Sequence, residues 1–220
     1  MNKDLTPPTP AEGVLYLASG SPQRKLLLDQ MGVNYKAFPQ DIDETFVAHS
    51  PEEEAKRLAK GKVESLLRVY PGVWALGADT FVTIKTISHS KKPGTTSFPG
   101  FHLIYPRLLG KPKDRKDAES ILTLLSGRTQ TVVTGLALAL PDGKIVTKVV
   151  KTRVKFSKLS TSDIRWYLDT GEWEDAAGAY RIQNKGACLA DTIKGSYSNV
   201  VGLPIKALYG ILHSNNYPMY

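Results

Sequence analysis

Apolar and polar residues follow two different periods along this chain, and the two periods predict a protein with both strands and helices. An apolar run at 14–18 meets a Ser/Gly/Pro turn, and a helical pattern then begins at Pro22 and ends near Met31–Gly32. Ser21 is a favourable N-cap, and Pro22 at the first helical position sacrifices no hydrogen bond. The segment therefore predicts a strand, a tight turn and a helix in direct succession.

Further strands and helices are predicted as far as residue 212. The predicted strands are 35–38, 73–78, 81–84, 131–140 and 144–156, and the predicted helices are 51–67, 113–125, 162–170 and 203–212. The strand at 73–78 is expected to end at Asp79–Thr80 before the chain resumes at 81–84. The two longest strands flank Pro141–Gly143, which is typical of a hairpin turn. Strands that alternate with helices predict the α/β class with a mixed sheet.

The domain organisation is expected to be simple. One domain spans 14–212, after a proline-containing lead at 1–13 that is expected to be disordered and before a C-terminal tail at 213–220. A polar, turn-rich stretch at about 86–107 interrupts the alternation of predicted strands and helices. It predicts a long surface insertion, and loops of that length are usually functional or mobile.

Composition narrows the class of protein. Hydrophobic residues make up 41% and charged residues 23% of the 220 residues, as in soluble globular proteins. No apolar run approaches the roughly 20 residues that span a bilayer, and the N-terminus lacks the apolar segment of a signal peptide. The single cysteine, Cys188, excludes an internal disulfide and fits the reducing cytoplasm. Without neighbouring metal ligands, Cys188 is expected to be a small buried side chain.

A formal net charge of +8 leaves two classes of partner open. A positive field attracts nucleic acid, and it attracts a small anionic substrate equally well. Apart from Arg24–Lys25 and Lys111–Lys116, however, the basic residues are scattered, and they do not alternate with aromatic residues as in RNA-binding motifs. Nucleic-acid binding is therefore the weakest hypothesis.

The turn before the first predicted helix is the leading candidate for chemistry. Free N–H groups at a helix start attract anions, and Ser19, Ser21, Arg24 and Lys25 add hydroxyl donors and positive charge there. The turn could thus hold a polyphosphate, although an ordinary capped helix explains the same residues.

Other candidate positions follow along the chain. Asp79 ends an apolar strand, where α/β sheets place ligand-binding groups, and Asp43 and Glu44 could complete a Mg²⁺ site. Lys111 stands on a Gly/Pro turn within reach of a phosphate, and the glycine-rich loops 178–183 and 195–204 suit a base or sugar. Taken singly, each position also has an ordinary structural explanation. Asp79 could lie in a turn that ends a strand, Asp43 and Glu44 in a solvated loop, and Lys111 at the surface, and the glycines could form tight turns.

Taken together, these segments resemble one family over residues 14–212. The motifs that carry the resemblance are 17–24, 43–44, 59–62, 77–80, 110–112, 125–127, 133–135, 178–183 and 195–204. They are similar to the Maf family of nucleotide pyrophosphatases, also called septum-formation inhibitor proteins. The resemblance implies a Maf/inosine-triphosphate-pyrophosphatase-like fold, with a long twisted mixed sheet, flanking helices and a cleft between two lobes. It also implies homodimers and a divalent cation, Mg²⁺, Mn²⁺ or Co²⁺.

The implied reaction is hydrolysis of a nucleoside triphosphate to the monophosphate and pyrophosphate. The resemblance assigns Asp79 as the central acidic residue, whose carboxylate acts as a base or orients a water bound to the metal. Glu44 is expected to help hold the metal. The residues expected to bind the substrate are Ser19, Ser21, Arg24, Lys62, Lys111 and Gln183. Of these, the cationic and hydroxyl side chains would neutralise the triphosphate and the departing pyrophosphate.

The residues at the motif positions are similar to those of the family branch that acts on dTTP and UTP. The position before Arg24, where that branch usually has a second arginine, is Gln23, and Arg181 replaces a common glycine. Arg181 would narrow the pocket or add a phosphate contact, and modified pyrimidine nucleotides are further candidate substrates. The alternatives are a 7-methyl-GTP pyrophosphatase and a non-catalytic, nucleotide-binding regulator of septum formation.

Overall fold

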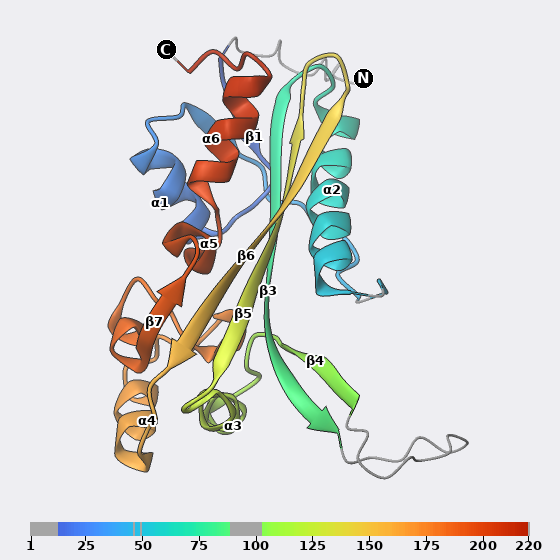
Figure 1. The fold of residues 1–220 in the computed structure, drawn as a ribbon. Coiled ribbons are helices and arrows are strands. Elements are labelled where there is room, and N and C mark those ends of the chain that lie inside the picture. The colour runs from blue at the N-terminus through green and yellow to red at the C-terminus, as the bar shows by residue number, and fades with distance from the viewer. Residues whose placement is uncertain (1–12, 46, 49, 89–102, 220) are drawn as a thin grey trace, which may run out of the picture. The chain divides into compact units, whose positions relative to one another are not determined.

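The computed structural model describes residues 13–45, 47–48, 50–88 and 103–219, and only the backbone of 86–88 and 103–106. The helices are α1 (Pro22–Gln30), α2 (Pro51–Val69), α3 (Arg115–Leu125), α4 (Thr161–Leu168), α5 (Tyr197–Val201) and α6 (Ile205–Ser214), with short 3-10 helices η1 (Ala177–Ala179) and η2 (Lys185–Leu189) (Figure 1). The strands are β1 (Leu15–Leu17), β2 (Tyr35–Ala37), β3 (Trp74–Ser88), β4 (Leu103–Leu109), β5 (Thr129–Ala139), β6 (Ile145–Phe156) and β7 (Ala190–Lys194). The predicted lead, as far as residue 12, and the centre of the predicted insertion, 89–102, lie outside the described residues.

The strands form one sheet in the order β2-β1-β3-β5-β6-β7, and β4 pairs with β3. β1 runs parallel to β2 and β3, whereas β4 is antiparallel to β3, so the sheet is mixed and the predicted α/β class is confirmed. The chain divides into two compact units. The first takes in the described residues up to Thr80 together with 132–152 and 194 onward, and the second takes in 81–131 and 153–193.

In the first unit, helices cover both faces of the sheet (Figure 1). Successive side chains of β1 point to opposite faces, so Leu15 and Leu17 join a core cluster with α1 and α6, while Tyr16 joins another with α2. Leu15 and Leu17 are fully buried and Tyr16 is 2% exposed. Burial on both faces is typical of parallel strands, and it explains why residues 14–18 form an unbroken apolar run.

Helix α2 packs directly on the backbone of the sheet at two glycines. A Cβ atom on Gly77 of β3 would lie 2.2 Å from the carbonyl oxygen of Ala59, and one on Gly135 of β5 would lie 2.2 Å from that of Ala55. Real Cβ atoms do not approach an oxygen so closely, so only glycine fits at either position. The absence of two side chains therefore sets how near α2 lies to β3 and β5.

The second unit is held by α3, α4 and a buried aromatic group. The helical spacing of Ala118, Ile121, Leu122 and Leu125 predicts one apolar face for the helix 113–125, and these residues form the buried face of α3. Tyr180 packs edge-on against Phe156 with ring centroids 4.9 Å apart, and its hydroxyl accepts a hydrogen bond of 2.6 Å from Gln130 Nε2. Burial raises the pKa of the Tyr180 phenol far above its usual range, so this hydroxyl remains protonated.

Several expectations from the sequence are wrong. Strand β3 continues through Asp79–Thr80 without a break. The ends of the predicted insertion are paired strand, because Ser88 lies opposite Leu103 and Ile84 opposite Arg107. Among the described strands β4 pairs with β3 alone, and an edge strand tolerates the missing N–H of Pro106.

Other parts of the chain also differ from the prediction. Cys188 is exposed rather than buried. β7, α5 and the two 3-10 helices were not predicted, because each is too short for a periodic pattern. In the predicted C-terminal tail, α6 extends to Ser214, and Tyr217 is 6% exposed and packs against Trp74.

No helix in the described ranges combines the length and apolar character needed to cross a bilayer.

Substitution of Gly135 by alanine should strongly destabilise the protein, because the new methyl group would meet the backbone of α2. Overpacking typically costs about 1–3 kcal/mol, and a clash with a helix backbone belongs at the upper end of that range. Gly210→Ala in α6 is the matched control, since apart from its chain neighbours and its own helix backbone no atom lies within 4 Å of its Cβ position. Removal of a helical glycine should stabilise by about 0.5–1 kcal/mol. Urea unfolding measures both, and equal stabilities would contradict the close approach of α2.

Candidate active site

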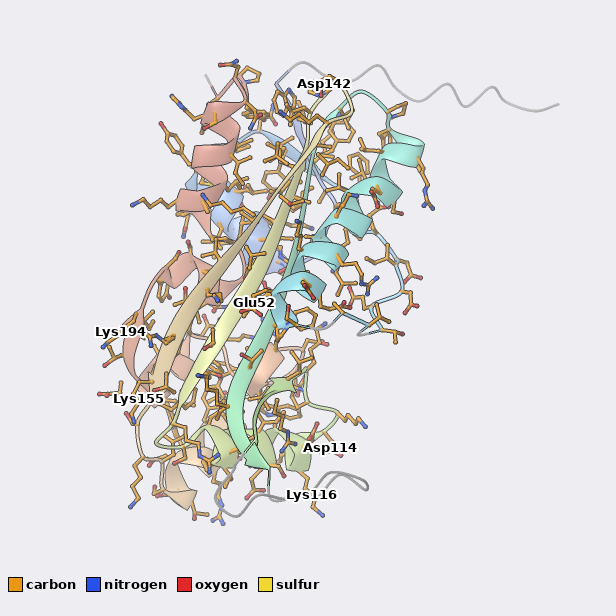
Figure 2. All side chains as sticks on the ribbon, turned by 45° about the vertical axis from the view of Figure 1, so that its right-hand side comes forward. Glu52, Asp114, Lys116, Asp142, Lys155 and Lys194 are labelled. Atoms are coloured by element: carbon orange, nitrogen blue, oxygen red, sulfur yellow. The ribbon has the colours of Figure 1, made fainter. Side chains whose placement is uncertain are left out.

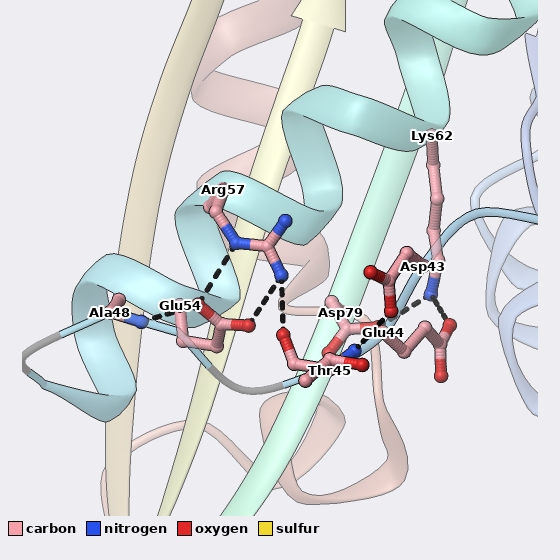
Figure 3. Close-up of polar contacts among 8 residues, drawn as sticks. All are labelled: Asp43, Glu44, Thr45, Ala48, Glu54, Arg57, Lys62 and Asp79. Carbon is pink, nitrogen blue, oxygen red and sulfur yellow. Dashed lines mark hydrogen bonds and ion pairs between the residues drawn. The ribbon is translucent and has the colours of Figure 1, made fainter.

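Three charged residues meet where α2 faces β3 (Figure 3). Lys62 Nζ on α2 lies 2.5 Å from Asp79 Oδ1 on β3 and 2.7 Å from Glu44 Oε1 in the segment before α2. The side chains of Lys62 and Asp79 are 9% and 11% exposed, whereas that of Glu44 is 60% exposed. The site thus has a buried inner pair and an outer carboxylate that solvent reaches.

The position of Lys62 follows from the packing of α2. Ala55, Ala59 and Lys62 are spaced by four and three residues, so they share the face of α2 that lies against the sheet. Helical side chains lean toward the helix N-terminus, and Figure 3 shows the chain of Lys62 descending toward Asp79. A buried ammonium needs a partner, and Asp79 supplies one.

Asp79 and Glu44 fit a partial set of ligands for a divalent cation. In the described ranges, no group of three or more His, Cys, Asp or Glu side chains is placed to hold a metal. Mg²⁺, however, is commonly bound by one or two carboxylates, with water and substrate phosphates completing the octahedron. Two carboxylates held around one ammonium match that pattern, in which the substrate supplies the remaining ligands.

The turn from Ser19 to Arg24 is ordered by its own side chains. Ser21 caps α1 by accepting a hydrogen bond from the backbone N–H of Arg24 at 3.5 Å, and Arg24 Nη1 donates to Ser19 Oγ at 2.8 Å. Arg24 Nε donates to the carbonyl oxygen of Gly202 at 3.1 Å. Gln23 Oε1 accepts a hydrogen bond of 3.1 Å from Ser21 Oγ. The predicted phosphate turn therefore has a fixed conformation, and Gly202 is a partner that the sequence did not reveal.

The positive charge of Arg24 interacts with the negative charges of the acidic residues. Loss of hydration lowers the pKa of its guanidinium from the ordinary value, and the charges of Asp79 and Glu44 act in the opposite direction. Because arginine stays protonated in proteins, Arg24 remains a cation here. The first unit thus brings together Arg24, Lys62, Asp79 and Glu44, four of the predicted site residues.

The glycine-rich loop at 195–204 is held mainly by hydrogen bonds to β5 and β6. Asn199 is fully buried, and its Nδ2 donates to the carbonyl oxygen of Val132 at 3.2 Å and to Thr152 Oγ1 at 3.0 Å. Ser196 caps α5 through the N–H of Asn199. A Cβ atom on Gly195 would lie 2.9 Å from Thr152 Oγ1. These contacts favour the interpretation of the loop as a tightly packed turn.

Lys111 and Gln183 belong to the second unit. The turn of Lys111 is tied to η1, because the N–H of Gly178 donates to the carbonyl oxygen of Gly110 at 3.0 Å. Lys111 Nζ lies 3.8 Å from Asp175 Oδ1, and both side chains are mostly exposed, so this ion pair contributes little. Gln183 is half-buried in the turn that precedes η2. The structure leaves the Lys111 side chain accessible to an anion.

The side chain of Arg181 donates hydrogen bonds to the backbone of the neighbouring loop at 172–174. Its Nε donates to the carbonyl oxygen of Glu172 at 2.9 Å, and its Nη2 donates to that of Glu174 at 2.7 Å. Its own N–H donates to the hydroxyl of Tyr167 at 3.0 Å. Burial raises the pKa of Tyr167 to about 12, so this hydroxyl stays neutral at physiological pH. Two of the guanidinium nitrogens are thus used by main-chain carbonyls of 172–174.

Sequence reasoning missed Glu54 and Arg57, which hold the segment around Glu44. Glu54 is fully buried on α2, and its carboxylate accepts hydrogen bonds from Arg57 Nε at 3.0 Å and from Arg57 Nη2 at 2.6 Å. The bond from Arg57 is the main reason that the pKa of Glu54 lies below its ordinary value. The run of three glutamates after Pro51 resembles an ordinary acidic first turn, so it gave no sign that one of them is buried.

Glu54→Gln should destabilise the protein at neutral pH but not in acid. Hydrogen bonds to charged groups contribute about 1.5–3 kcal/mol, and the amide loses part of that. The folded state lowers the pKa of Glu54 from 4.5, so its stabilisation is complete above that pH and disappears as the pH falls through the lowered pKa. Urea unfolding at a series of pH values from neutral into the acid range measures how the difference from the unmodified chain changes. A difference that persists in acid contradicts this account, and Glu64→Gln, in an exposed pair with Lys60, is the control.

Comparison with known proteins identifies the family of this chain. The model of a family described as Maf-like protein matches residues 14–215. A protein of Myxococcus xanthus named dTTP/UTP pyrophosphatase is 39% identical over all of this chain and 97% of its own length. Proteins with that name from Symbiobacterium thermophilum and Pyrococcus abyssi are 40% and 36% identical, over 94% and 90% of this chain and 96% and 95% of their own lengths. The chain therefore belongs to the Maf family.

Proposed function

We propose that the chain is a nucleoside triphosphate pyrophosphatase that converts dTTP and UTP to the monophosphate and pyrophosphate. The observation that carries this proposal is the group of Lys62, Asp79 and Glu44 beside a basic turn, in a chain of the Maf family. The names of the three relatives support the choice of dTTP and UTP.

Asp79 is proposed as the central acid, which accepts a proton from the attacking water or orients that water toward the α-phosphorus. Its side chain is 11% exposed, so a reacting water would be held where bulk solvent competes little. Lys62 compensates the charge of Asp79 and keeps its carboxylate in one orientation at 2.5 Å. Movement of the ammonium toward a phosphate would release one carboxylate oxygen for the water.

Glu44 and Asp79 are proposed to hold a divalent cation, for which Mg²⁺, Mn²⁺ and Co²⁺ are the candidates. Such an ion, when bound, supplies charge neutralisation on phosphate oxygens and lowers the pKa of a coordinated water. Glu44 suits this role because its exposed carboxylate can meet an incoming ion without breaking the buried pair.

The substrate is proposed to bind through groups on several elements. Ser19, Ser21 and Arg24 lie at the N-terminus of α1, where backbone N–H groups and the helix dipole favour phosphate. Lys62 and Lys111 would add positive charge toward the triphosphate and the departing pyrophosphate. Gln183 offers an amide that can pair with a polar edge of the base or sugar.

Two alternatives make different predictions. A 7-methyl-GTP pyrophosphatase would release pyrophosphate from a methylated purine and not from dTTP or UTP. A regulator without catalysis would bind nucleotide and release nothing. The complete set of acidic, basic and amide groups favours catalysis, because binding alone does not require the two carboxylates. Homodimers and a cytoplasmic location remain predictions.

Asp79→Asn should reduce pyrophosphate release from dTTP and UTP in the presence of Mg²⁺ or Mn²⁺ to a small fraction of the unmodified rate. Loss of a general base typically lowers the rate by about 10²–10⁴-fold. The measurement is pyrophosphate released from a panel of nucleotides, with and without each metal. Urea unfolding accompanies it, because the substitution also leaves the Lys62 ammonium without its buried partner.

Asp142→Asn is the matched control for this measurement. Asp142 lies at the exposed turn between β5 and β6 (Figure 2), where its side chain caps the N–H of Lys144 and an asparagine can do the same. This variant should retain full activity. Turnover of 7-methyl-GTP alone would support the first alternative, and nucleotide binding without turnover would support the regulator.

A further inference from the structure

Glu44 lies in a segment without regular secondary structure, so other parts of the chain must determine where its carboxylate sits. The described residues from Asp41 to Ala48 form neither helix nor strand. Within this segment, the N–H of Thr45 donates to Asp43 Oδ1 at 2.9 Å, a bond that shapes the turn locally but does not attach it to the fold. An exposed side chain on such a segment would otherwise sample many positions.

Two residues of α2 attach this segment to the helix (Figure 3). Arg57 Nη2 donates to the carbonyl oxygen of Thr45 at 2.9 Å, directly after Glu44. Glu54 Oε2 accepts a hydrogen bond of 3.1 Å from the N–H of Ala48. One ion pair therefore holds the segment at a carbonyl and at an N–H that are three residues apart.

The chemistry of the two side chains suits this role. The planar guanidinium donates to both oxygens of Glu54 and still reaches Thr45, which a lysine ammonium on a flexible stem cannot reproduce. Glu54 is fully buried, and a buried carboxylate must have its acceptor sites filled. Arg57 and Ala48 fill them, so release of the segment would leave the carboxylate undersatisfied.

We propose that Arg57 is a positioning residue for Glu44: through the carbonyl of Thr45, and with Glu54 fixing its orientation, it holds Glu44 within reach of Lys62 and Asp79. The proposal rests on the proposed role of Glu44 in metal binding. It predicts that metal affinity depends on a residue that is not itself a ligand. Partners that orient metal ligands typically change metal affinity by 10–100-fold when they are removed.

The first measurement is Mn²⁺ binding to the full chain, without nucleotide and with a non-hydrolysable dTTP analogue, for Arg57→Lys, Glu44→Gln and the double variant. Arg57→Lys keeps the charge and loses the fork, so the Mn²⁺ dissociation constant should rise about tenfold. Glu44→Gln should raise it at least as much. If Arg57 acts through Glu44, the double variant should bind no more weakly than Glu44→Gln alone.

The second measurement is hydrogen exchange at the backbone amides of Thr45 and Ala48. Both should exchange faster in Arg57→Lys and at an unchanged rate in Lys60→Ala. Lys60 is the matched control, because it forms an exposed pair with Glu64 at 3.1 Å on the same helix. If Arg57→Lys does not fold, Glu54→Gln takes its place and should show the same pattern.

The outcomes separate this inference from the proposed function. Unchanged exchange, unchanged Mn²⁺ affinity or additive effects in the double variant would each overturn the positioning role and leave the proposed reaction standing. An unmodified chain that turns over dTTP but binds no Mn²⁺ in either condition would overturn the metal assignment and this inference together. Faster exchange combined with non-additive loss of affinity would support the inference even if no nucleotide is hydrolysed.

Discussion

The approach of α2 to the backbone of β3 and β5 is the constraint on which the rest of the site depends. With a carbonyl of α2 2.2 Å from the Cβ position of each of two glycines, no side chain separates helix from sheet. Lys62 follows one turn after Ala59, and Asp79 lies two residues after Gly77 on the same face of β3. The small residues thus bring a lysine and an aspartate into direct contact, and the same helix carries Glu54 and Arg57.

Charge balance explains why this partly buried group of charges is tolerable. Lys62 and Arg24 carry two positive charges, and Asp79 and Glu44 carry two negative ones, so the group is neutral before any ligand arrives. A buried charge without a partner is expensive, and neutrality removes most of that cost. A triphosphate adds several negative charges to such a balanced group. Binding of a triphosphate would therefore favour an additional cation, which is the physical basis for proposing a divalent ion.

The sequence was most informative where local rules decide the structure. Caps such as Ser21 and the periodic face of α3 depend on near neighbours, and both were predicted correctly. Pairing between distant segments was not predictable: the two strands flanking residues 89–102 are held together by hydrogen bonds that no local pattern records. Likewise, burial of Glu54 depends on Arg57 and Ala48. The neighbouring glutamates are the same type of residue, but they are not buried, so residue type alone does not identify the buried one.

Gln23 illustrates how a substitution that removes charge can add order. From the sequence, the missing cation beside Arg24 predicts weaker phosphate binding or a changed specificity. In the structure, Gln23 engages the hydroxyl of Ser21, while Ser21 caps the N–H of Arg24 and Arg24 reaches Ser19 and Gly202. A turn already fixed in this way loses less conformational entropy when an anion binds. If the turn binds a phosphate as proposed, preorganisation would offset part of the lost Coulomb attraction, without the salt sensitivity of an exposed charge.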